Sequence, residues 1–255
     1  YDKFKTYASI VPKLAGNPLY YWTHLELKNI FNINLPLNAE NAEYIWNEAN
    51  EKLKSIKILD LFNKFKVKYV ATTDDPLDEL NFHGNYNNTL IAPTFRCDKA
   101  LSLNDEYIKK LGEVTGEDTS SLNGFLSALV NRLSYFANCG CKLADHGFGG
   151  FMREIISEKE AENIYLKGEN ATSKEKECFF FFVLKILAKE YKKRNIVMQL
   201  HFSALRNVNT IMFEKTGADS GFDVMGEDAN IENIANFLNE LQKNNALPKT
   251  VLYTL

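Results

Sequence analysis

From residue 67 onward, short β-branched or apolar runs alternate along the chain with longer segments of helical periodicity. The runs lie at 67–73, 90–95, 141–144, 196–202 and 251–255, and the clearest helical segments at 121–138, 174–193 and 231–244. Strands separated by helical crossovers predict a parallel sheet covered by helices. The largely apolar strand runs also suit strands that are buried on both faces. The pattern therefore predicts an α/β fold.

The first 65 residues have a different pattern, with helical periodicity and no strand signal. Residues 56–65 read as helical, and residues 38–53 place five apolar residues on one helical face: Ala42, Ile45, Trp46, Ala49 and Leu53. We expect a helical region over residues 1–65 and an α/β region over residues 66–255.

The charge balance argues against a nucleic-acid-binding protein. The sequence has 30 lysines and arginines against 33 aspartates and glutamates, for a net charge of −3. Such a chain has no cationic excess with which to neutralise a phosphate backbone. We expect a small-molecule ligand and no nucleic-acid partner.

Cysteine usage and hydropathy indicate a cytoplasmic protein without a membrane partner. The four cysteines form no C-x-x-C pair, which argues against a disulfide framework or a four-cysteine zinc site and fits a reducing compartment. No run approaches the roughly 18 apolar residues of a membrane span. The four phenylalanines at 179–182 have charged residues on both sides, so we expect a buried helix face there.

Polar residues gather where the predicted strands end. In chain order they are Thr72 to Asp75, Arg96, Asp145 with His146, and His201. The carboxyl ends of parallel strands open on one face of the sheet, so these side chains should share a pocket. The segment Asp74-Asp75-Pro76 also reads as a helix start, with acidic residues before a proline.

The residue types leave the chemistry of this pocket open. His201 could bind a metal, move a proton or only donate a hydrogen bond. Asp145 could act as a base, a metal ligand or a helix N-cap. Arg96 and Arg206 could clamp a carboxylate with paired hydrogen bonds or form surface ion pairs. A nucleotide phosphate loop, an H-x-H pair, an H-E-x-x-H motif and a G-x-S-x-G elbow are all absent from the sequence.

Seven stretches, in order and well spaced, resemble the uronate isomerases of the amidohydrolase superfamily. They are GNPLYYWTHLEL (16–27), TTDDPLD (72–78), PTFRCDKA (93–100), ADH (144–146), QLHFSALRN (199–207), TGADSGFD (216–223) and LPKTVLY (247–253). The resemblance implies a distorted (β/α)8 TIM-type barrel, with residues 1–65 as part of an insertion after the first barrel strand. It also implies an isomerase that interconverts D-glucuronate with D-fructuronate, or D-galacturonate with D-tagaturonate.

The same resemblance assigns roles to individual residues. It implies that Asp145 and Arg206 are catalytic, that Arg96, Arg206 and His24 bind the substrate, and that His201 lies at a metal. The cofactor implied is a divalent metal, with zinc as the first choice, and the partner is a hexuronate. A homo-oligomer is left open.

The sequence also departs from the family pattern. Uronate isomerases carry an H-x-H pair on the first strand and a D-x-R motif on the last, and this sequence has neither. Tyr21 stands where the family has histidine, and Cys97 where it has proline. The chain also begins at Tyr1 and ends in an apolar run, so we expect an internal fragment with an incomplete barrel and an incomplete site. A sugar-acid-binding domain without turnover and a metal-dependent hydrolase are the alternatives.

Overall fold

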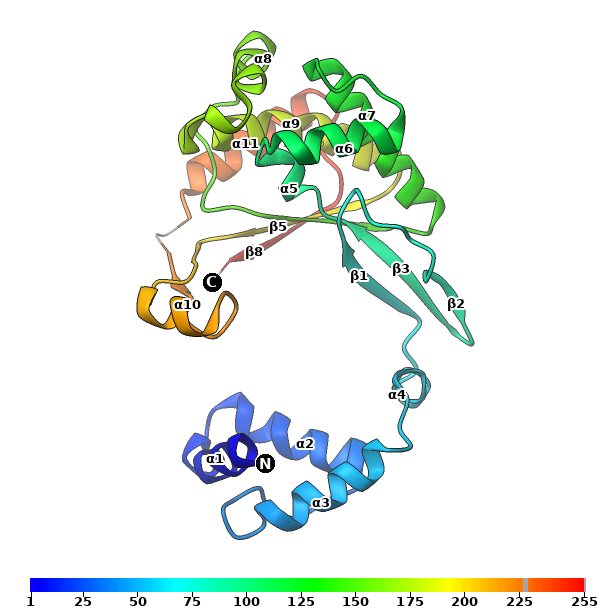
Figure 1. Cartoon of the computed structure of the whole chain (residues 1–255), viewed down its shortest axis with the longest axis vertical. Helices are drawn as coiled ribbons and strands as arrows, with labels where there is room; N and C mark the ends of the chain where they lie inside the picture. The colour runs from blue at the N-terminus through cyan, green and yellow to red at the C-terminus, as the bar shows by residue number, and fades with distance from the viewer. Residues whose placement is uncertain (227–228, 255) are drawn as a thin grey trace. The chain divides into compact units, whose positions relative to one another are not determined.

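The chain folds into two compact units. A computed structural model describes residues 1–226 and 229–254. Unit 1 comprises residues 1–68 and 86–89, and unit 2 comprises residues 69–85 and the described residues from 90 onward. Figure 1 shows the elements of both. Each unit buries its own apolar core.

Unit 1 is helical, as the periodicity predicts. Its elements are α1 (Asp2–Ile10), the 3-10 helix η1 (Val11–Leu14), α2 (Pro18–Phe31), α3 (Ala42–Leu53) and α4 (Ile58–Lys64). The helix expected from residue 38 begins at Ala42, because the Asn38 side chain accepts the Asn41 N–H and closes a turn before it. The placement of residues 1–65 as an insertion after a first barrel strand stays a prediction.

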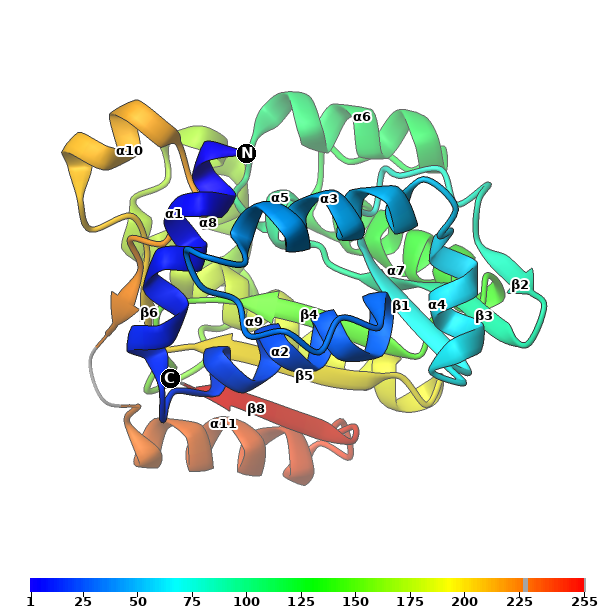
Figure 2. The same ribbon diagram turned by 90° about the horizontal axis from the view of Figure 1, so that it is seen from below.

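Unit 2 is built on a parallel sheet, which confirms the α/β prediction. The five parallel strands pair in the order β1 (Tyr69–Asp74), β3 (Thr89–Phe95), β4 (Leu143–Gly147), β5 (Val197–Phe202) and β8 (Thr250–Thr254), and β2 (Gly84–Tyr86) pairs with β3. Figure 2 shows β4, β5 and β8 side by side. The short strands β6 (Ala204–Leu205) and β7 (Val224–Met225) form a separate antiparallel pair.

The order of the parallel strands follows the chain without a reversal. A doubly wound sheet reverses its strand order at a switch point, whereas a (β/α)8 barrel adds each strand beside the previous one. Figure 1 shows α5, α6, α7, α9 and α11 on one face of the sheet, as in a barrel wall. The part of the chain that the structure describes supplies five of these strands, so unit 2 is an incomplete TIM-type barrel.

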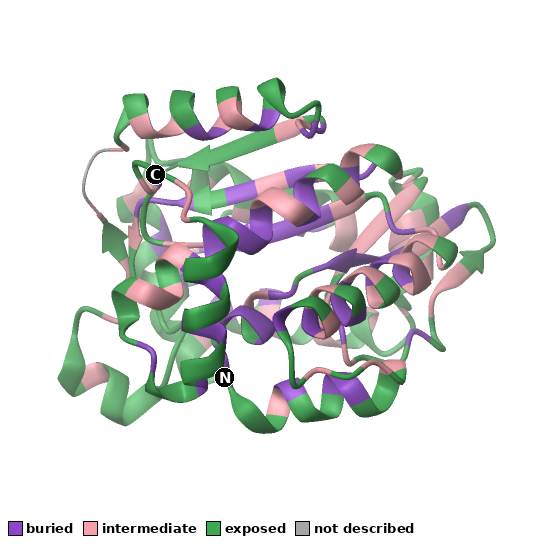
Figure 3. Ribbon diagram, turned by 90° about the horizontal axis from the view of Figure 1, so that it is seen from above, coloured by how far each residue is buried: buried purple, intermediate pink, exposed green. Residues whose placement is uncertain are grey.

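The helices of unit 2 cover the sheet and complete its core. They are α5 (Asp98–Leu101), α6 (Asp105–Thr115), α7 (Leu122–Asn138), α8 (Glu158–Lys167), the 3-10 helix η2 (Gly168–Asn170), α9 (Ser173–Lys193), α10 (Thr210–Thr216) and α11 (Ile231–Lys243). Phe179, Phe180, Phe181 and Phe182 of α9 are all buried, which confirms the expected buried face. Figure 3 shows buried residues along both strands and helices. In residues 1–226 and 229–254, no helix combines the length and the apolar content that a membrane crossing needs.

The helix expected to start at Asp74-Asp75-Pro76 does not form, and that prediction is wrong. Asp74 is the last residue of β1, and a turn follows it. The Asp75 side chain accepts the Leu77 N–H, and the Asp78 side chain accepts the Asp75 N–H. The acidic residues therefore cap a single turn, a role for which aspartate is equally suited.

The start of α9 gives a testable pH effect. The Lys167 ammonium and the N–H and hydroxyl of Thr172 donate to Glu175 and lower the pKa of its carboxyl group from 4.5 to about 2. A folded-state pKa below the unfolded value favours folding above the ordinary pKa, and this contribution disappears as the pH falls through about 2. We expect an NMR titration midpoint for Glu175 near pH 2 that rises in Lys167→Met. Lys174→Met, whose ammonium lies 3.6 Å from Glu177, should leave it unchanged, and equal midpoints in both variants would contradict the assignment.

Candidate active site

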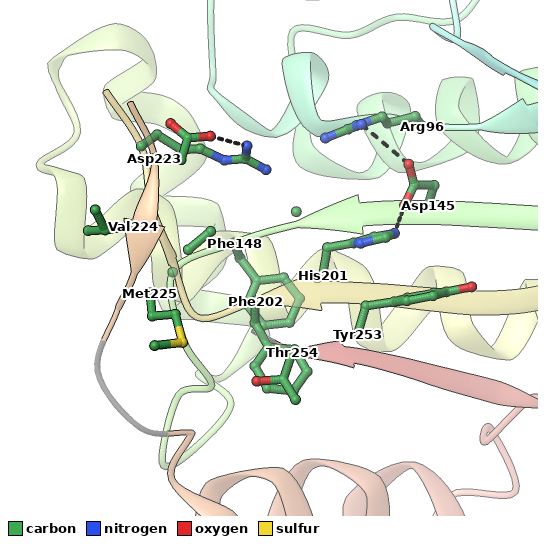
Figure 4. Close-up of a pocket in the computed structure, with 14 residues that line it drawn as sticks. Arg96, Asp145, Phe148, His201, Phe202, Asp223, Val224, Met225, Tyr253 and Thr254 are labelled. Atoms are coloured by element: carbon green, nitrogen blue, oxygen red, sulfur yellow. Dashed lines mark hydrogen bonds and ion pairs between the residues drawn. The ribbon is translucent and has the colours of Figure 1, made fainter. Parts of the chain in front are cut away.

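A pocket of about 880 Å³ lies at the carboxyl ends of the parallel strands of unit 2 (Figure 4). Arg96 follows β3, Asp145 lies in β4, His201 in β5 and Tyr253 in β8, and all four line it. The segment that carries β6 and β7 contributes Arg206 and further wall residues. The expectation that the polar strand ends share a pocket is therefore confirmed for Arg96, Asp145 and His201.

Asp145 occupies the middle of this group. Its Oδ2 atom lies 3.3 Å from Arg96 Nη1, and its Oδ1 atom lies 2.8 Å from His201 Nε2. Figure 4 shows the carboxylate between the Arg96 and His201 side chains. Because Asp145 lies inside β4, it is not a helix N-cap. The remaining alternatives for this residue are a base or a metal ligand.

The Oδ1 atom of Asp145 is buried and lacks an aligned hydrogen-bond donor among the described residues. The His201 ring nitrogen is close enough for an ion pair, but an N–H on that nitrogen does not point at the oxygen. The contact is therefore electrostatic, because the two atoms are close but an N–H on the ring nitrogen points away from the oxygen. The oxygen therefore keeps lone-pair capacity for a further partner.

The His201 ring is held by stacking. Its centroid lies 4.3 Å from that of Tyr253, and the two rings are 3° from parallel. The Tyr253 hydroxyl donates to Gln199 Oε1 at 2.9 Å, which anchors the stacked ring from the far side. Sequence reasoning missed Tyr253, although it lies in a strand-end segment that resembles the family.

Arg96 is held by a second carboxylate. Its Nε atom donates to Asp98 Oδ2 at 3.1 Å, and Asp98 also accepts from His146 Nδ1 and from the Gly147 N–H. Burial acts to raise the pKa of Asp98, but the His146 hydrogen bond, the Gly147 N–H and the Arg96 charge outweigh it and lower that pKa. The carboxylate form of Asp98 is therefore favoured beside the guanidinium.

Arg206 is paired with a carboxylate on the other side of the pocket. Its Nη1 atom lies 2.5 Å from Asp223 Oδ2, and the Asn207 N–H donates to Asp223 Oδ1. The Asn207 N–H and the Arg206 guanidinium lower the pKa of Asp223. Sequence reasoning did not select Asp223, although it is the last residue of the 216–223 stretch.

His24 lies in unit 1, on α2. Its Nε2 atom accepts the Leu37 N–H at 3.0 Å, so its Nδ1 atom carries the proton and donates to the Tyr20 carbonyl at 2.6 Å. Both ring nitrogens of His24 are therefore paired with backbone groups of unit 1. Its predicted role in substrate binding stays a prediction.

The donor set does not form a metal site by itself. Among residues 1–226 and 229–254, no group of three or more histidine, cysteine, aspartate or glutamate side chains is arranged to hold an ion. Zinc takes at least three protein ligands in most catalytic sites. The Asp145 carboxylate and the His201 imidazole supply two donors, one fewer than such a site needs.

Comparison with known sequences gives one consistent result. The sequence profile of the glucuronate isomerase family matches residues 1–255. A uronate isomerase of Oceanobacillus iheyensis is 40% identical over 269 residues, which cover 100% of this chain and 57% of the relative. The uronate isomerase of Brachyspira hyodysenteriae is 38% identical over 271 residues, with 100% and 58% covered. The chain thus spans little more than half the length of these curated relatives.

Comparison with solved structures agrees. The uronate isomerase of Thermotoga maritima is similar with a TM-score of 0.89 and 34% identity, covering 100% of this chain and 58% of that one. The glucuronate isomerase of Caulobacter crescentus has a TM-score of 0.88 at 24% identity, covering 99% of this chain and 55% of that one, which supports the fold alone.

Proposed function

The chain belongs to the glucuronate isomerase family, and on that premise we propose that the whole protein is an aldose–ketose isomerase of hexuronates. The reaction interconverts D-glucuronate with D-fructuronate, or D-galacturonate with D-tagaturonate. The observation that carries the proposal is the convergence of Arg96, Asp145, His201 and Arg206 on one pocket. Each comes from a different strand end or from the β6–β7 segment.

The residue types suit a sugar acid. An open-chain hexuronate has a carboxylate at one end and an aldehyde at the other. Guanidinium groups bind carboxylates with charge-assisted hydrogen bonds, and we assign this role to Arg96 and Arg206. We assign Arg206 a second role, because its positive charge stabilises the negative oxygen that develops during the reaction.

The chemical step moves a proton between two neighbouring carbons. Asp145 takes the proton from C2 of the aldose, the C2–H electron pair forms the C1=C2 bond, and the aldehyde oxygen becomes protonated. The resulting enediol then loses the proton of its C2 hydroxyl to solvent, the C2=O bond forms, and Asp145 returns its proton to C1. Asp145 suits the role of base because its Oδ1 atom lacks an aligned donor among the described residues.

We also propose that His201 supplies one ligand to a divalent metal, zinc in the first instance, whose other ligands lie outside the described residues. When bound, such an ion would polarise the substrate carbonyl. The cytoplasmic location, a hexuronate as the small-molecule partner, and the absence of nucleic-acid and membrane partners stay predictions, and a homo-oligomer stays open.

The test is an assay of the full-length protein with D-glucuronate and added Zn²⁺. We expect a ketose of unchanged mass by NMR and mass spectrometry. In D₂O, deuterium should appear at C1 of the ketose if the transferred proton exchanges with solvent. Turnover of a uronate lactone or ester to a product heavier by one water, with no isomer formed from D-glucuronate, would favour the hydrolase. Saturable binding of D-glucuronate without turnover would favour the sugar-acid-binding domain; either result would overturn the isomerase.

A further inference from the structure

A chain of polar contacts runs from the pocket into the core of unit 2. Arg96 Nε donates to Asp98 Oδ2, Asp98 Oδ1 lies 3.2 Å from His146 Nδ1, and His146 Nε2 lies 2.9 Å from the Tyr191 hydroxyl. His146 and Tyr191 are completely buried. This series of polar contacts therefore begins at the solvent-exposed Arg96 guanidinium and ends among apolar side chains.

The hydrogen bonds of His146 in this series have a defined donor and acceptor. A carboxylate only accepts hydrogen bonds, so the His146 Nδ1 atom carries a proton and donates it to Asp98. In the neutral imidazole the Nε2 atom then accepts the Tyr191 O–H. The ring itself is fixed by Tyr191, which stacks at 5.8 Å, and by the edge of Phe180 at 6.1 Å. A buried ring with both nitrogens paired resists rotation, because rotation would leave two polar atoms unpaired in the core.

Asp98 is thus fixed before it meets Arg96. Its Oδ1 atom accepts from His146, and its Oδ2 atom accepts from the Gly147 N–H at 3.2 Å as well as from Arg96. The two donors other than Arg96, the His146 ring and the Gly147 N–H, leave the carboxylate little freedom. The orientation of the guanidinium is therefore set by a group that does not line the pocket.

Two further contacts limit the Arg96 guanidinium. Its Nη1 atom lies 3.3 Å from Asp145 Oδ2, and its Nη2 atom lies beside Gly147, where an added Cβ would be only 3.2 Å away. The Nη2 atom has no hydrogen-bond acceptor among the described residues. The arginine therefore keeps Nη2 available to a pocket ligand while its Nε and Nη1 atoms are occupied.

We propose that Asp98 and His146 are positioning residues that orient Arg96 so that Nη2 faces the carboxylate of the bound sugar acid. The identity of that carboxylate rests on the proposed function. The orientation itself rests only on the contacts described above. Asp98 and His146 touch neither the ligand nor the reacting atoms, and they act through Arg96.

Four variants of the full-length protein test the proposal. Asp98→Asn leaves one carbonyl oxygen for three donors, and His146→Leu removes the donor that fixes Asp98. His146→Asn keeps an amide N–H near the Nδ1 position and should rescue. Phe180→Leu is the matched control, because it disturbs the same buried ring contact without removing a polar group.

The first readout is independent of activity. The Arg96 Nε–H signal can be assigned in ¹⁵N-arginine-labelled protein by its loss in Arg96→Lys. We expect slow hydrogen exchange of this proton in the wild type, His146→Asn and Phe180→Leu, and at least tenfold faster exchange in Asp98→Asn and His146→Leu. Slow exchange in all variants would overturn the proposed orientation.

The second readout is kinetic. We expect KM for D-glucuronate to rise about 10- to 100-fold in Asp98→Asn and His146→Leu, with a smaller change in kcat, because a charge-assisted hydrogen bond is misdirected. Faster exchange with an unchanged KM would overturn the carboxylate part of the proposal. If the exchange differences between variants appear as expected but the wild-type protein does not isomerise uronates, the positioning role is supported and the proposed function is rejected.

Discussion

Asp145→Asn is expected to lower kcat for hexuronate isomerisation by about 10²- to 10⁴-fold, the usual contribution of a general base. The amide has nearly the same volume as the carboxylate, so no cavity forms between Arg96 and His201. It cannot accept the C2 proton, however, and the step that begins the reaction is lost. Initial rates of ketose formation by the full-length protein, measured at saturating D-glucuronate, give the effect directly.

The matched control is Asp75→Asn, which changes another carboxylate of unit 2 whose side chain is as little exposed as that of Asp145, 12% in each case. Asp75 Oδ1 accepts the Tyr107 hydroxyl at 2.5 Å and the Leu77 N–H at 3.0 Å, and the residue does not line the pocket. We expect kcat to stay within about twofold of the wild type and the free energy of unfolding to fall by roughly 1 kcal/mol. Equal loss of kcat in both variants would mean that Asp145 acts through folding and is not the base.

The largest stability effect is expected for Phe181→Ala. The ring is 2% exposed and packs against four other aromatic rings, with centroid distances of 5.1 to 5.7 Å: Phe148, Phe151, Phe180 and Phe237. Truncating a buried phenylalanine costs about 3–5 kcal/mol, which lowers the melting temperature of a domain this size by roughly 6–20 °C.

Differential scanning calorimetry of the full-length protein measures this shift. Leu166→Ala on α8 is the control, because its side chain is 69% exposed and its removal opens no cavity. We expect the control to melt within about 2 °C of the wild type. A shift of similar size in both variants would show that α9 is not the centre of the core.

Much of the fold could be predicted from the sequence because buried strands need apolar side chains on both faces. All five predicted runs correspond to the parallel strands, with ends that differ by a few residues. The short strands β2, β6 and β7 were missed, since two or three residues are too few to show a period. The false helix start at Asp75 arose because a turn and a helix N-terminus use the same capping chemistry.

The candidate site was predicted only in part. The strand-end rule selected Arg96, Asp145 and His201, because a parallel sheet brings its carboxyl ends together whatever the details of packing. The link from Asp98 to His146 was missed, since these residues are 48 positions apart and meet only through the β3–β4 pairing. Pairwise side-chain geometry of this kind leaves no periodic trace in a single sequence.

Residues 179–184 of α9 are all buried, a stretch longer than one helical turn. Successive residues on a helix are about 100° apart, so this segment has packed neighbours around its whole circumference. A mutational scan along most helices gives a wave of tolerated and damaging positions with a period of 3.6 residues. Across 179–184 the same scan should give a plateau of damaging positions, and tolerance should return on both sides of it, where Cys178, Lys185 and Ile186 are only partly buried.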